Sequence, residues 1–362
     1  MTRPCRRVWI LCILVVALAA TFLVFIAAES PAIMPANRQQ VLFLMRSDKA
    51  RSYGQFGSQM QCFMDLLLAV RGGPHQLVEP VFFIQPRNNT AYELAGPGAR
   101  GDHFLGTAAI PWSSWLDMGQ LERFLHQTPL PWQDAPPHID LLLSTLNECS
   151  DGVTTTTTYQ QRVFRIIRCQ RIPTGLGMEA WRRLLTLHAN FTVAIDAYGG
   201  DMWPQSIRWR DAHPKLWREA LSAVRFSADI ERVAAAYAPT HTCLHWRRGD
   251  RAHAEMSDYG LRYWERAAPQ RIAQHMARGT FIMTNSGNQG ERNLLSAAGG
   301  RFLEADVFPH WHDELKRLGV EMSICMASAG FVALGSEYWD CSTPSRLIID
   351  WRAERNVTYL WK

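Results

Sequence analysis

The chain alternates short apolar segments with longer segments in which apolar residues recur at helical spacing, and this order restricts its fold more than any other feature. The first unit runs from QQVLFLMR (39–46) through the glycine-containing loop SYGQFGSQ and the helical stretch MQCFMDLLLAV to HQLVEPVFF. A strand, a glycine loop, a helix and a second strand form the opening unit of a Rossmann-like sheet. IDLLLST (139–145) and FTVAID (191–196) predict further strands, and TTTTT (154–158) predicts a surface loop or an exposed strand.

A second alternation begins near residue 225. TCLHW, TFIMTN and GFVALGS predict strands, and SADIERVAAAYA, ERNLLSAAG and DELKRLGVEMSICMASA predict helices. RYWERAAPQRIAQHMA is predicted to be mostly helical, with an interruption at Pro269. PSRLIIDWRAER predicts a closing helix with Pro344 in its first turn, where proline is tolerated. The two alternations predict an α/β protein with two Rossmann-like domains, residues 39–224 and 225–362, that face each other across a cleft.

The N-terminal segment 8–28 contains no charged residue and is long enough to span a bilayer as a helix. It follows a short basic stretch, MTRPCRR, and this order favours a cytoplasmic tail of residues 1–7, a signal anchor of residues 8–28 and a stem of residues 29–38. A cleaved signal peptide is the alternative, although its apolar region is normally about half as long. Either reading places the rest of the chain in the lumen of the secretory pathway.

Two further features agree with a lumenal location. Glycosylation sequons begin at Asn88, Asn190 and Asn356. Six cysteines lie beyond the anchor and are widely spread: Cys62, Cys149, Cys169, Cys243, Cys325 and Cys341. Some of them should form disulfides in an oxidising lumen, but fifteen connectivities are possible and the sequence does not choose among them.

Several classes of function have no support in the sequence. The formal net charge of +5 is modest, whereas a nucleic-acid-binding protein usually has a stronger basic bias. The chain has neither an H-E-x-x-H run nor a C-x-x-C pair, so we predict no metal site. A nucleotide-binding cleft fits the pattern better.

Three polar stretches fall where a nucleotide cleft would need them. YGQFGSQ (53–59) opens the first helix, HWRRGD (245–250) ends the first strand of the second half, and CSTPSR (341–346) opens the last helix. The amides and the positive end of a helix favour phosphate, and Ser342 and Thr343 can add hydroxyl donors. An arginine at a strand end could neutralise a diphosphate with a two-pronged contact.

Side chains alternate along a strand, so His245 and Arg247 are predicted to share one face while Arg248 points to the other. The alternatives are purely structural roles: a buried core histidine at His245 and helix caps at Ser342 and Thr343. Asp250 either orients Arg247 or caps a turn.

These stretches resemble the GDP-fucose protein O-fucosyltransferase family over most of the chain beyond the anchor. Gly54–Gln59 is similar to the family pattern G-R-F-G-N-Q, and His245-Trp246-Arg247 to its H-x-R signature. PWSSWLDMGQLERF (111–124), TFIMTNSGNQGE and the stretch from FVALGS to the last helix resemble other family segments. The run HWRRGD also resembles the H-x-R-R-x-D pattern of α1,6-fucosyltransferases.

The resemblance implies a GT-B-type glycosyltransferase that uses GDP-fucose as donor and inverts the sugar carbon, with no obligatory cofactor or metal. It places the acceptor in the N-terminal domain and the nucleotide sugar in the C-terminal one. Arg247 would stabilise the departing β-phosphate as the catalytic residue, and Glu321 would lie near the base. The implied donor-binding residues are Gln55, Phe56, Gly57, Ser58, His245, Trp246, Arg247, Arg248, Asp250, Glu321, Ser342, Thr343 and Pro344.

The chain departs from the family pattern at three positions. Gln55 stands where the family has arginine, Ser58 where it has asparagine, and Pro344 where it has an aromatic residue. We expect a single-pass type II protein of the Golgi or endoplasmic reticulum membrane that transfers fucose to a hydroxyl, on Ser or Thr of a protein. The alternatives are a glycan acceptor, another nucleotide sugar, or a lumenal binding protein that has kept the fold and lost turnover.

Overall fold

The computed structural model of the protein describes most of the chain beyond residue 38. Its residues are 39–44, 56–84, 108–144, 155–159, 162–173, 176–196, 210–237, 241–247, 267–284, 288–310, 313–337, 341–352 and 356–360. The predicted tail, anchor and stem lie outside these ranges. Within the ranges, no helix combines the length and the apolar character needed to cross a bilayer.

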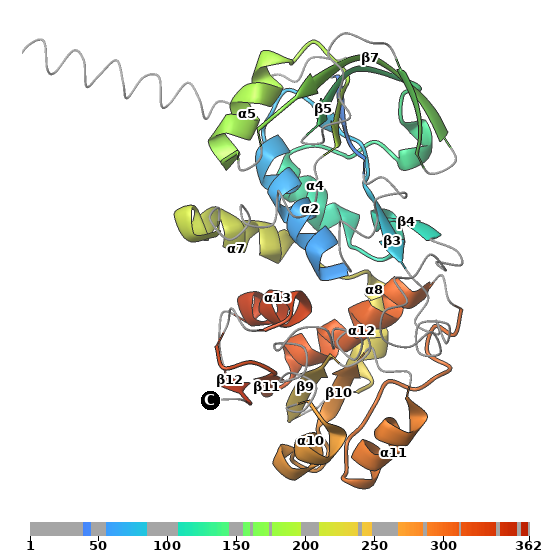
Figure 1. The fold of residues 1–362 in the computed structure, drawn as a ribbon, viewed down its shortest axis with the longest axis vertical. Helices are drawn as coiled ribbons and strands as arrows, with labels where there is room; N and C mark the ends of the chain where they lie inside the picture. Colours follow the sequence, from blue (N-terminus) through green and yellow to red (C-terminus); the bar gives the residue numbers. More distant parts are fainter. Residues whose placement is uncertain are drawn as a thin grey trace, which may run out of the picture. The chain divides into compact units, whose positions relative to one another are not determined.

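A six-stranded sheet is built from the first half of the chain (Figure 1). Its strands lie in the order β2-β1-β8-β5-β7-β6, and all neighbouring pairs are parallel except β6 with β7 at the edge. The central strands are buried on both faces, which explains why their sequences are continuous apolar runs. The bounds are β1 Gln40–Phe43, β2 Gln76–Leu77, β5 His138–Ser144, β6 Thr155–Tyr159, β7 Arg162–Arg171 and β8 Val193–Asp196.

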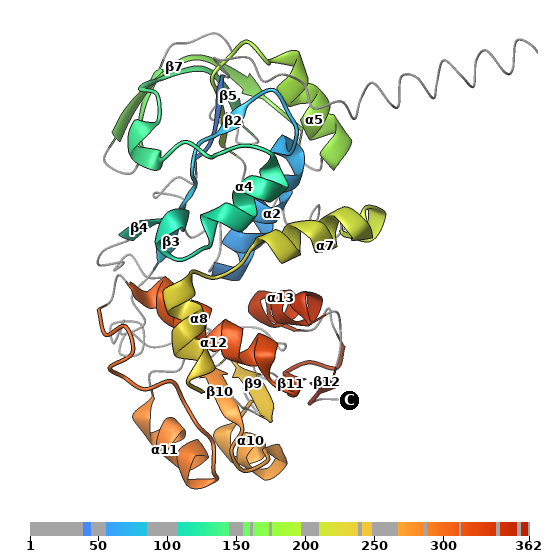
Figure 2. The ribbon, with the colours of Figure 1, turned by 180° about the vertical axis from the view of Figure 1, so that it is seen from behind.

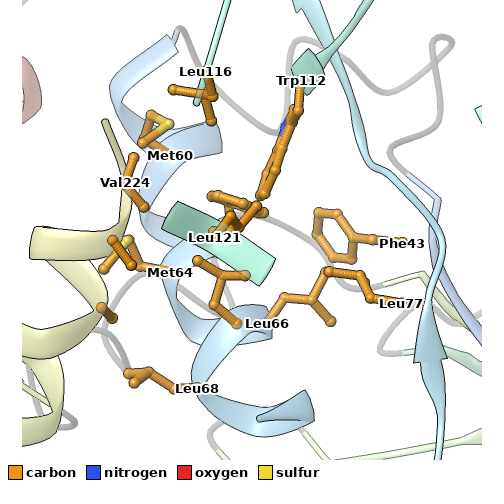
Figure 3. Packing of buried hydrophobic residues seen from close by; sticks show 14 of the residues in the cluster. Phe43, Met60, Met64, Leu66, Leu68, Leu77, Trp112, Leu116, Leu121 and Val224 are labelled. Atoms are coloured by element: carbon orange, nitrogen blue, oxygen red, sulfur yellow. The ribbon is translucent and has the colours of Figure 1, made fainter. Parts of the chain in front are cut away.

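The helices beside this sheet bury their apolar faces in one core. Trp112 and Leu121 of α4 pack in the same cluster as Leu66 of α2 and Phe43 of β1 (Figure 3). Asp117 begins α4 because its carboxylate accepts hydrogen bonds from the amides of Gly119 and Gln120. The helices are α2 Phe56–Val70, α4 Met118–Leu125, α5 Met178–Leu187 and α7 Pro214–Ala223, with short 3-10 turns at Trp112–Ser114 and Trp132–Asp134.

The segment HQLVEPVFF was predicted as one strand, and this prediction was wrong. Its first part, β2, pairs with β1, whereas its second part, β3 (Val81–Ile84), pairs antiparallel with β4 (Ala108–Pro111) in a separate sheet. Pro80 lies between them and has no N–H to donate to a sheet ladder. The amide of Glu79 bonds to Leu130 O instead, so the chain leaves the first sheet at this point.

The first helix also begins earlier than the sequence suggested. Phe56, Gly57 and Ser58, which were expected in the glycine loop, form the first turn of α2. The threonine run is the edge strand β6, and the ten-residue strand β7 beside it was not predicted at all. Charged and apolar residues are mixed in β7, and this masks the period-two pattern of a strand.

A four-stranded, fully parallel sheet is built from the second half of the chain, with the order β10-β9-β11-β12. Strands β9, β10 and β11 and helices α8 and α12 lie in the segments that the sequence predicted, and α11 and α13 overlap theirs. The predicted interruption at Pro269 was wrong, because Pro269 occupies the first turn of α10, where its missing N–H is tolerated. The division into domains 39–224 and 225–362 stays a prediction. The strands are β9 Thr242–Trp246, β10 Phe281–Thr284, β11 Gly330–Ala333 and β12 Val357–Tyr359, and the helices are α8 Ala228–Ala235, α10 Pro269–His275, α11 Gln289–Ala297, α12 Glu314–Ala327 and α13 Thr343–Trp351.

The two faces of this sheet are covered by different helices. Helices α12 and α13 lie on one face and α10 and α11 on the other, as both views show (Figures 1 and 2). Cys243 of β9 belongs to the core on the α12 side, whereas Leu244 and Trp246 pack with Ile272 of α10 and Leu295 of α11. Side chains therefore alternate along β9, but the expected opposite directions of Arg247 and Arg248 stay a prediction because Arg248 lies outside the described residues.

Helix α12 is fixed to the sheet at its carboxyl-terminal end. A disulfide joins Cys243 of β9 to Cys325 of α12, and Cys169 of β7 is disulfide-bonded as well. The guanidinium of Arg352 donates hydrogen bonds to the carbonyl oxygens of Cys325, Met326 and Ser328, which are orphan acceptors at the end of α12. Partial burial lowers the pKa of Arg352 from its ordinary value.

Asp65 is a buried carboxyl group in the middle of α2. Its side chain is 0% exposed, and neither carboxyl oxygen has a hydrogen-bond partner among the described residues. Burial raises the pKa of Asp65 well above its ordinary value because the charged form would lose its hydration. The folded protein therefore keeps this carboxyl protonated at a pH where the unfolded chain releases the proton.

This difference makes the stability depend on pH. The unfolded Asp65 loses its proton above the ordinary value near 3.8, so stability falls as pH rises from there toward the raised folded pKa. Asp65→Asn cannot ionise and should stabilise the protein at pH 7 by about 1 kcal/mol or more. The gain in melting temperature over wild type should shrink as the pH is lowered toward 4. Asp134→Asn, at an exposed position, is the matched control; an equal gain at every pH would contradict the burial argument.

Candidate functional site

The carboxyl ends of β9 and β11 form the topological switch point of the four-stranded sheet. From β9 the chain continues to β10 on one side, and from β11 it continues to β12 on the other. Open parallel sheets bind ligands where the connections diverge in this way. His245 lies at this end of the sheet, in register with Met283 of β10 and Ala333 of β11.

His245 is held by two serines of the last helix. Its Nδ1 lies 2.7 Å from Ser345 Oγ and 3.1 Å from Ser342 Oγ, and the two hydroxyls are 3.2 Å apart. All three side chains are buried, with exposures of 5%, 2% and 8% for His245, Ser345 and Ser342. If Nδ1 accepts the hydroxyl proton of Ser345, the ring carries its own proton on Nε2 and can donate it to an anion.

The N-terminus of α13 lies at the same place. Ser342 is its N-cap residue, but the hydroxyl makes no capping bond and contacts His245 instead, so the reading of Ser342 as a simple cap was wrong. Pro344 is in the first turn, as predicted, and supplies no N–H. The amides of Thr343 and Ser345 remain as first-turn donors at the positive end of the helix. This geometry suits an anionic group.

Arginines flank the serine–histidine cluster on two elements. Arg247 follows β9 directly and is partly exposed. Arg346, in the first turn of α13, is 6% exposed. Arg247 was predicted from the sequence as a site residue, whereas Ser345 and Arg346 were not, although both lie in the stretch CSTPSR. The i, i+3 spacing of Ser342 and Ser345 would have placed both hydroxyls on one helix face.

The disulfide between α12 and β9 indicates how far Glu321 lies along the direction of the strands. This helix connects β10 to the parallel strand β11 and therefore runs antiparallel to the strands. Glu321 precedes Cys325 by one turn, about 6 Å toward the carboxyl end of the sheet. His245 follows Cys243 by two residues, about 6.6 Å in the same direction. Glu321, which is 3% exposed, therefore lies at the level of His245.

The structure describes only part of the predicted donor site. It brings together His245 and Ser342, and Arg247 follows His245 by two residues in the chain. Gln55, Arg248 and Asp250 lie outside the described residues, and of Phe56, Gly57, Ser58 and Thr343 only the backbone is described.

Trp246 has a structural role. It is 0% exposed, and its indole N–H donates to Ala267 O at 2.9 Å. The structure therefore gives no support to its predicted contact with a donor.

The other predicted features lie in the core, at a helix cap or on the surface. In the segment PWSSWLDMGQLERF, Trp112 and Trp115 are fully buried and Asp117 caps α4, so these residues stabilise the fold. Of the sequons, Asn190 and Asn356 are exposed in turns, while Asn88 lies outside the described residues. In the part of the chain that the structure describes, no group of three or more His, Cys, Asp or Glu residues could hold a metal ion.

Comparison with known proteins gives a likeness of fold at low sequence identity. No family model matches the chain, and no curated protein sequence matches it. A crystal structure of POFUT1 in complex with GDP-fucose is 13% identical, with a TM-score of 0.55, and the match covers 90% of this chain and 99% of that one. A structure of POFUT1 in complex with GDP is 14% identical, also with a TM-score of 0.55, over 90% and 98% of the two chains.

A structure of NodZ α-1,6-fucosyltransferase soaked with GDP-fucose is 10% identical over 86% of this chain and 92% of that one. Its TM-score of 0.39 supports no further argument. The resemblance of HWRRGD to the α1,6-fucosyltransferase pattern therefore stays a prediction. The POFUT1 likeness and the parallel sheets confirm the α/β class, and the chain shares its fold with a protein that has been crystallised with a nucleotide sugar.

The serine–histidine cluster can be tested by removing its hydroxyls. After Ser345→Ala, Ser342 still reaches His245 Nδ1, so the loss should be small. Ser342→Ala together with Ser345→Ala removes both hydroxyl partners of a buried ring nitrogen, which costs about 1–3 kcal/mol. Denaturant unfolding of the two single variants and the double variant should show a loss in the double variant larger than the sum. A loss equal to or below the sum would mean that the serines do not share His245.

Proposed function

We propose that the protein is an inverting glycosyltransferase that transfers fucose from GDP-fucose to a hydroxyl group, on Ser or Thr of a protein. The observation that carries the proposal is the buried cluster of His245, Ser342 and Ser345 at the N-terminus of α13, located at the switch point of a parallel sheet. Hydroxyls, amides and the helix dipole all favour a diphosphate there. The fold shared with POFUT1, solved in complex with GDP-fucose, supports this choice of donor.

In this reaction the acceptor oxygen forms a bond to the anomeric carbon while the bond from that carbon to the diphosphate oxygen breaks. The electron pair of the broken bond stays on GDP, so negative charge develops on the β-phosphate, and the proton of the acceptor hydroxyl passes to the departing diphosphate or to solvent. Fixed donors that are already oriented stabilise that charge without reorganising. Arg247 supplies a planar guanidinium. In the tautomer whose Nδ1 accepts from Ser345, His245 supplies its Nε2 proton as a second donor. Glu321, which is buried in α12, would orient groups on the α12 side of the site.

The proposed location is the membrane of the Golgi or endoplasmic reticulum, with residues 8–28 as a type II anchor and the rest in the lumen. The disulfide between Cys243 and Cys325 supports an oxidising compartment, because such bonds are rare in the cytosol. The exposed positions of Asn190 and Asn356 suit glycan attachment.

A thermal-shift panel of nucleotide sugars tests the donor without knowledge of the acceptor. A ligand that binds only the folded chain stabilises it by about 2.7 kcal/mol when its concentration is 100 times Kd. GDP and GDP-fucose should raise the melting temperature, and UDP-glucose and UDP-N-acetylglucosamine should not. Equal shifts from UDP sugars would contradict the proposed donor. GDP-fucose binding without release of free fucose or transfer would instead favour a binding protein that has lost turnover.

The role of Arg247 predicts a separation of binding from turnover. Arg247→Lys keeps the charge but loses the two-pronged donor, so it should lower turnover about a hundredfold while weakening GDP-fucose binding much less. The exposed Arg271→Lys, in the same half of the chain, is the control and should behave as wild type. Initial rates of donor consumption and donor affinity are measured on the same preparations. Turnover near the wild-type rate in Arg247→Ala would exclude this mechanism.

A further inference from the structure

A second pocket lies at the opposite end of the four-stranded sheet from the serine–histidine cluster. Its volume is about 400 Å³, and it is lined by the end of α8 and by the segment that follows α11. Tyr237 of its wall packs edge-on against Phe281, with ring centroids 5.8 Å apart. Phe281 is the first residue of β10, so the pocket lies at the amino-terminal ends of the strands, whereas His245 lies at their carboxyl ends. The main lining residues are Arg232, Val233, Tyr237, Arg301, Glu304 and Val307.

Backbone pairing places Arg301 in this wall. Arg301 forms a parallel bridge with Phe281, since its N–H donates to Thr280 O at 2.8 Å and its carbonyl accepts from Ile282 N at 2.7 Å. Its guanidinium lies 5.9 Å from the centroid of the Tyr237 ring. The bridge extends the edge of the sheet by one residue, so Arg301 has a defined position although it lies in a connecting segment.

The rest of the wall is also held in place. Arg317 of α12 donates hydrogen bonds to the carbonyl oxygens of Glu304, Ala305 and Val307. The hydroxyl of Tyr237 accepts a bond from the amide of Glu304 at 3.3 Å. Hydrogen bonds therefore hold the segment 301–307 to the end of α8 and to α12. A preformed site loses less conformational entropy when a ligand binds.

The charges of the wall are not neutralised internally. Arg232 and Arg301 make no ion pair with any residue that the structure describes. Glu304 is exposed on the same wall and likewise has no ion-pair partner there. Two guanidinium groups and one carboxylate leave a net charge of +1, which matches a singly charged anion better than a phosphate dianion.

We infer that this pocket binds a monosaccharide unit that carries a carboxylate. The volume is in the lower range of small-molecule sites. The Tyr237 ring and the apolar side chains Val233 and Val307 offer a surface for the C–H face of a sugar ring. Arg232 and Arg301 offer planar donors for a carboxylate, and Glu304 can accept from ring hydroxyls. The inference does not depend on the proposed transferase activity, because the pocket is at the other end of the sheet.

Glucuronate and N-acetylneuraminate are the two acidic probes, and they distinguish a uronic acid from a sialic acid. Glucose tests the ring without the charge, and inorganic phosphate tests the charge without the ring. Calorimetric titration of the purified full-length chain should show saturable binding of at least one acidic sugar, and at least tenfold weaker binding of both glucose and phosphate. No saturable binding of either acid would overturn the inference, and so would binding of glucose or phosphate that equals that of the acids.

Substitutions of the two arginines in the wall test whether the acidic sugar binds in this pocket. Arg301→Gln and Arg232→Gln should each weaken the acidic sugar at least tenfold, because each removes a charged hydrogen-bond donor. Arg271→Gln, on the exposed face of α10, is the matched control and should leave the affinity unchanged. GDP binding should be the same in all three variants. Unchanged affinity for the acid in both Arg232→Gln and Arg301→Gln would show that it binds elsewhere. If GDP fails to bind wild type while the acid binds as expected, the proposed donor site is wrong and the second pocket stands.

Discussion

The structure of the second half of the chain depends on strand β9, which has a neighbouring strand on each side and a helical layer on each face. Its side chains alternate strictly: Cys243 and His245 face α12 and α13, whereas Leu244 and Trp246 pack against α10 and α11. A shift of one residue would bury the histidine among apolar side chains and break the disulfide to Cys325, so the register of β9 is strongly specified. The position of the serine–histidine cluster follows from this register.

The start of α13 at the end of the sheet is required by the fold, and it is also the feature on which the proposed binding of a diphosphate depends. The last helix connects β11 to the neighbouring strand β12, so its first turn lies at the carboxyl end of the sheet, where Ser342 and Ser345 contact His245 of β9. Any helix there would bring positive amide groups to the switch point. This chain adds Ser342 and Ser345, which keep the buried ring of His245 hydrogen-bonded. A buried histidine without partners would be costly, so the serines stabilise the fold and orient the ring together.

Local pattern predicted much of this structure, and tertiary context accounts for the rest. The bounds of β9 followed from the short apolar run TCLHW, whereas Trp246 was expected at the donor and is instead buried against α10 and α11. The split of HQLVEPVFF and the strand β7 did not follow, because the first depends on a partner strand, β4, and the second mixes charged and apolar residues. Ser345 was missed because its role depends on contact with a residue that is distant in the sequence.

The second pocket illustrates the same limit for binding sites. Arg232 lies in the last turn of α8, where a basic side chain usually interacts favourably with the helix dipole. Arg301 follows two glycines in an irregular segment. Neither position has a sequence signature. They share a wall because Arg301 pairs with the first residue of β10 while Tyr237, beside the end of α8, packs on that same residue. Phe281 thus fixes both halves of the pocket, just as His245 links β9 to α13 at the other end. The proposed donor site and the proposed acidic-sugar site therefore lie at opposite ends of one parallel sheet and would offer their ligands different chemistry: helix amides and hydroxyls at one end, and guanidinium groups beside an aromatic ring at the other.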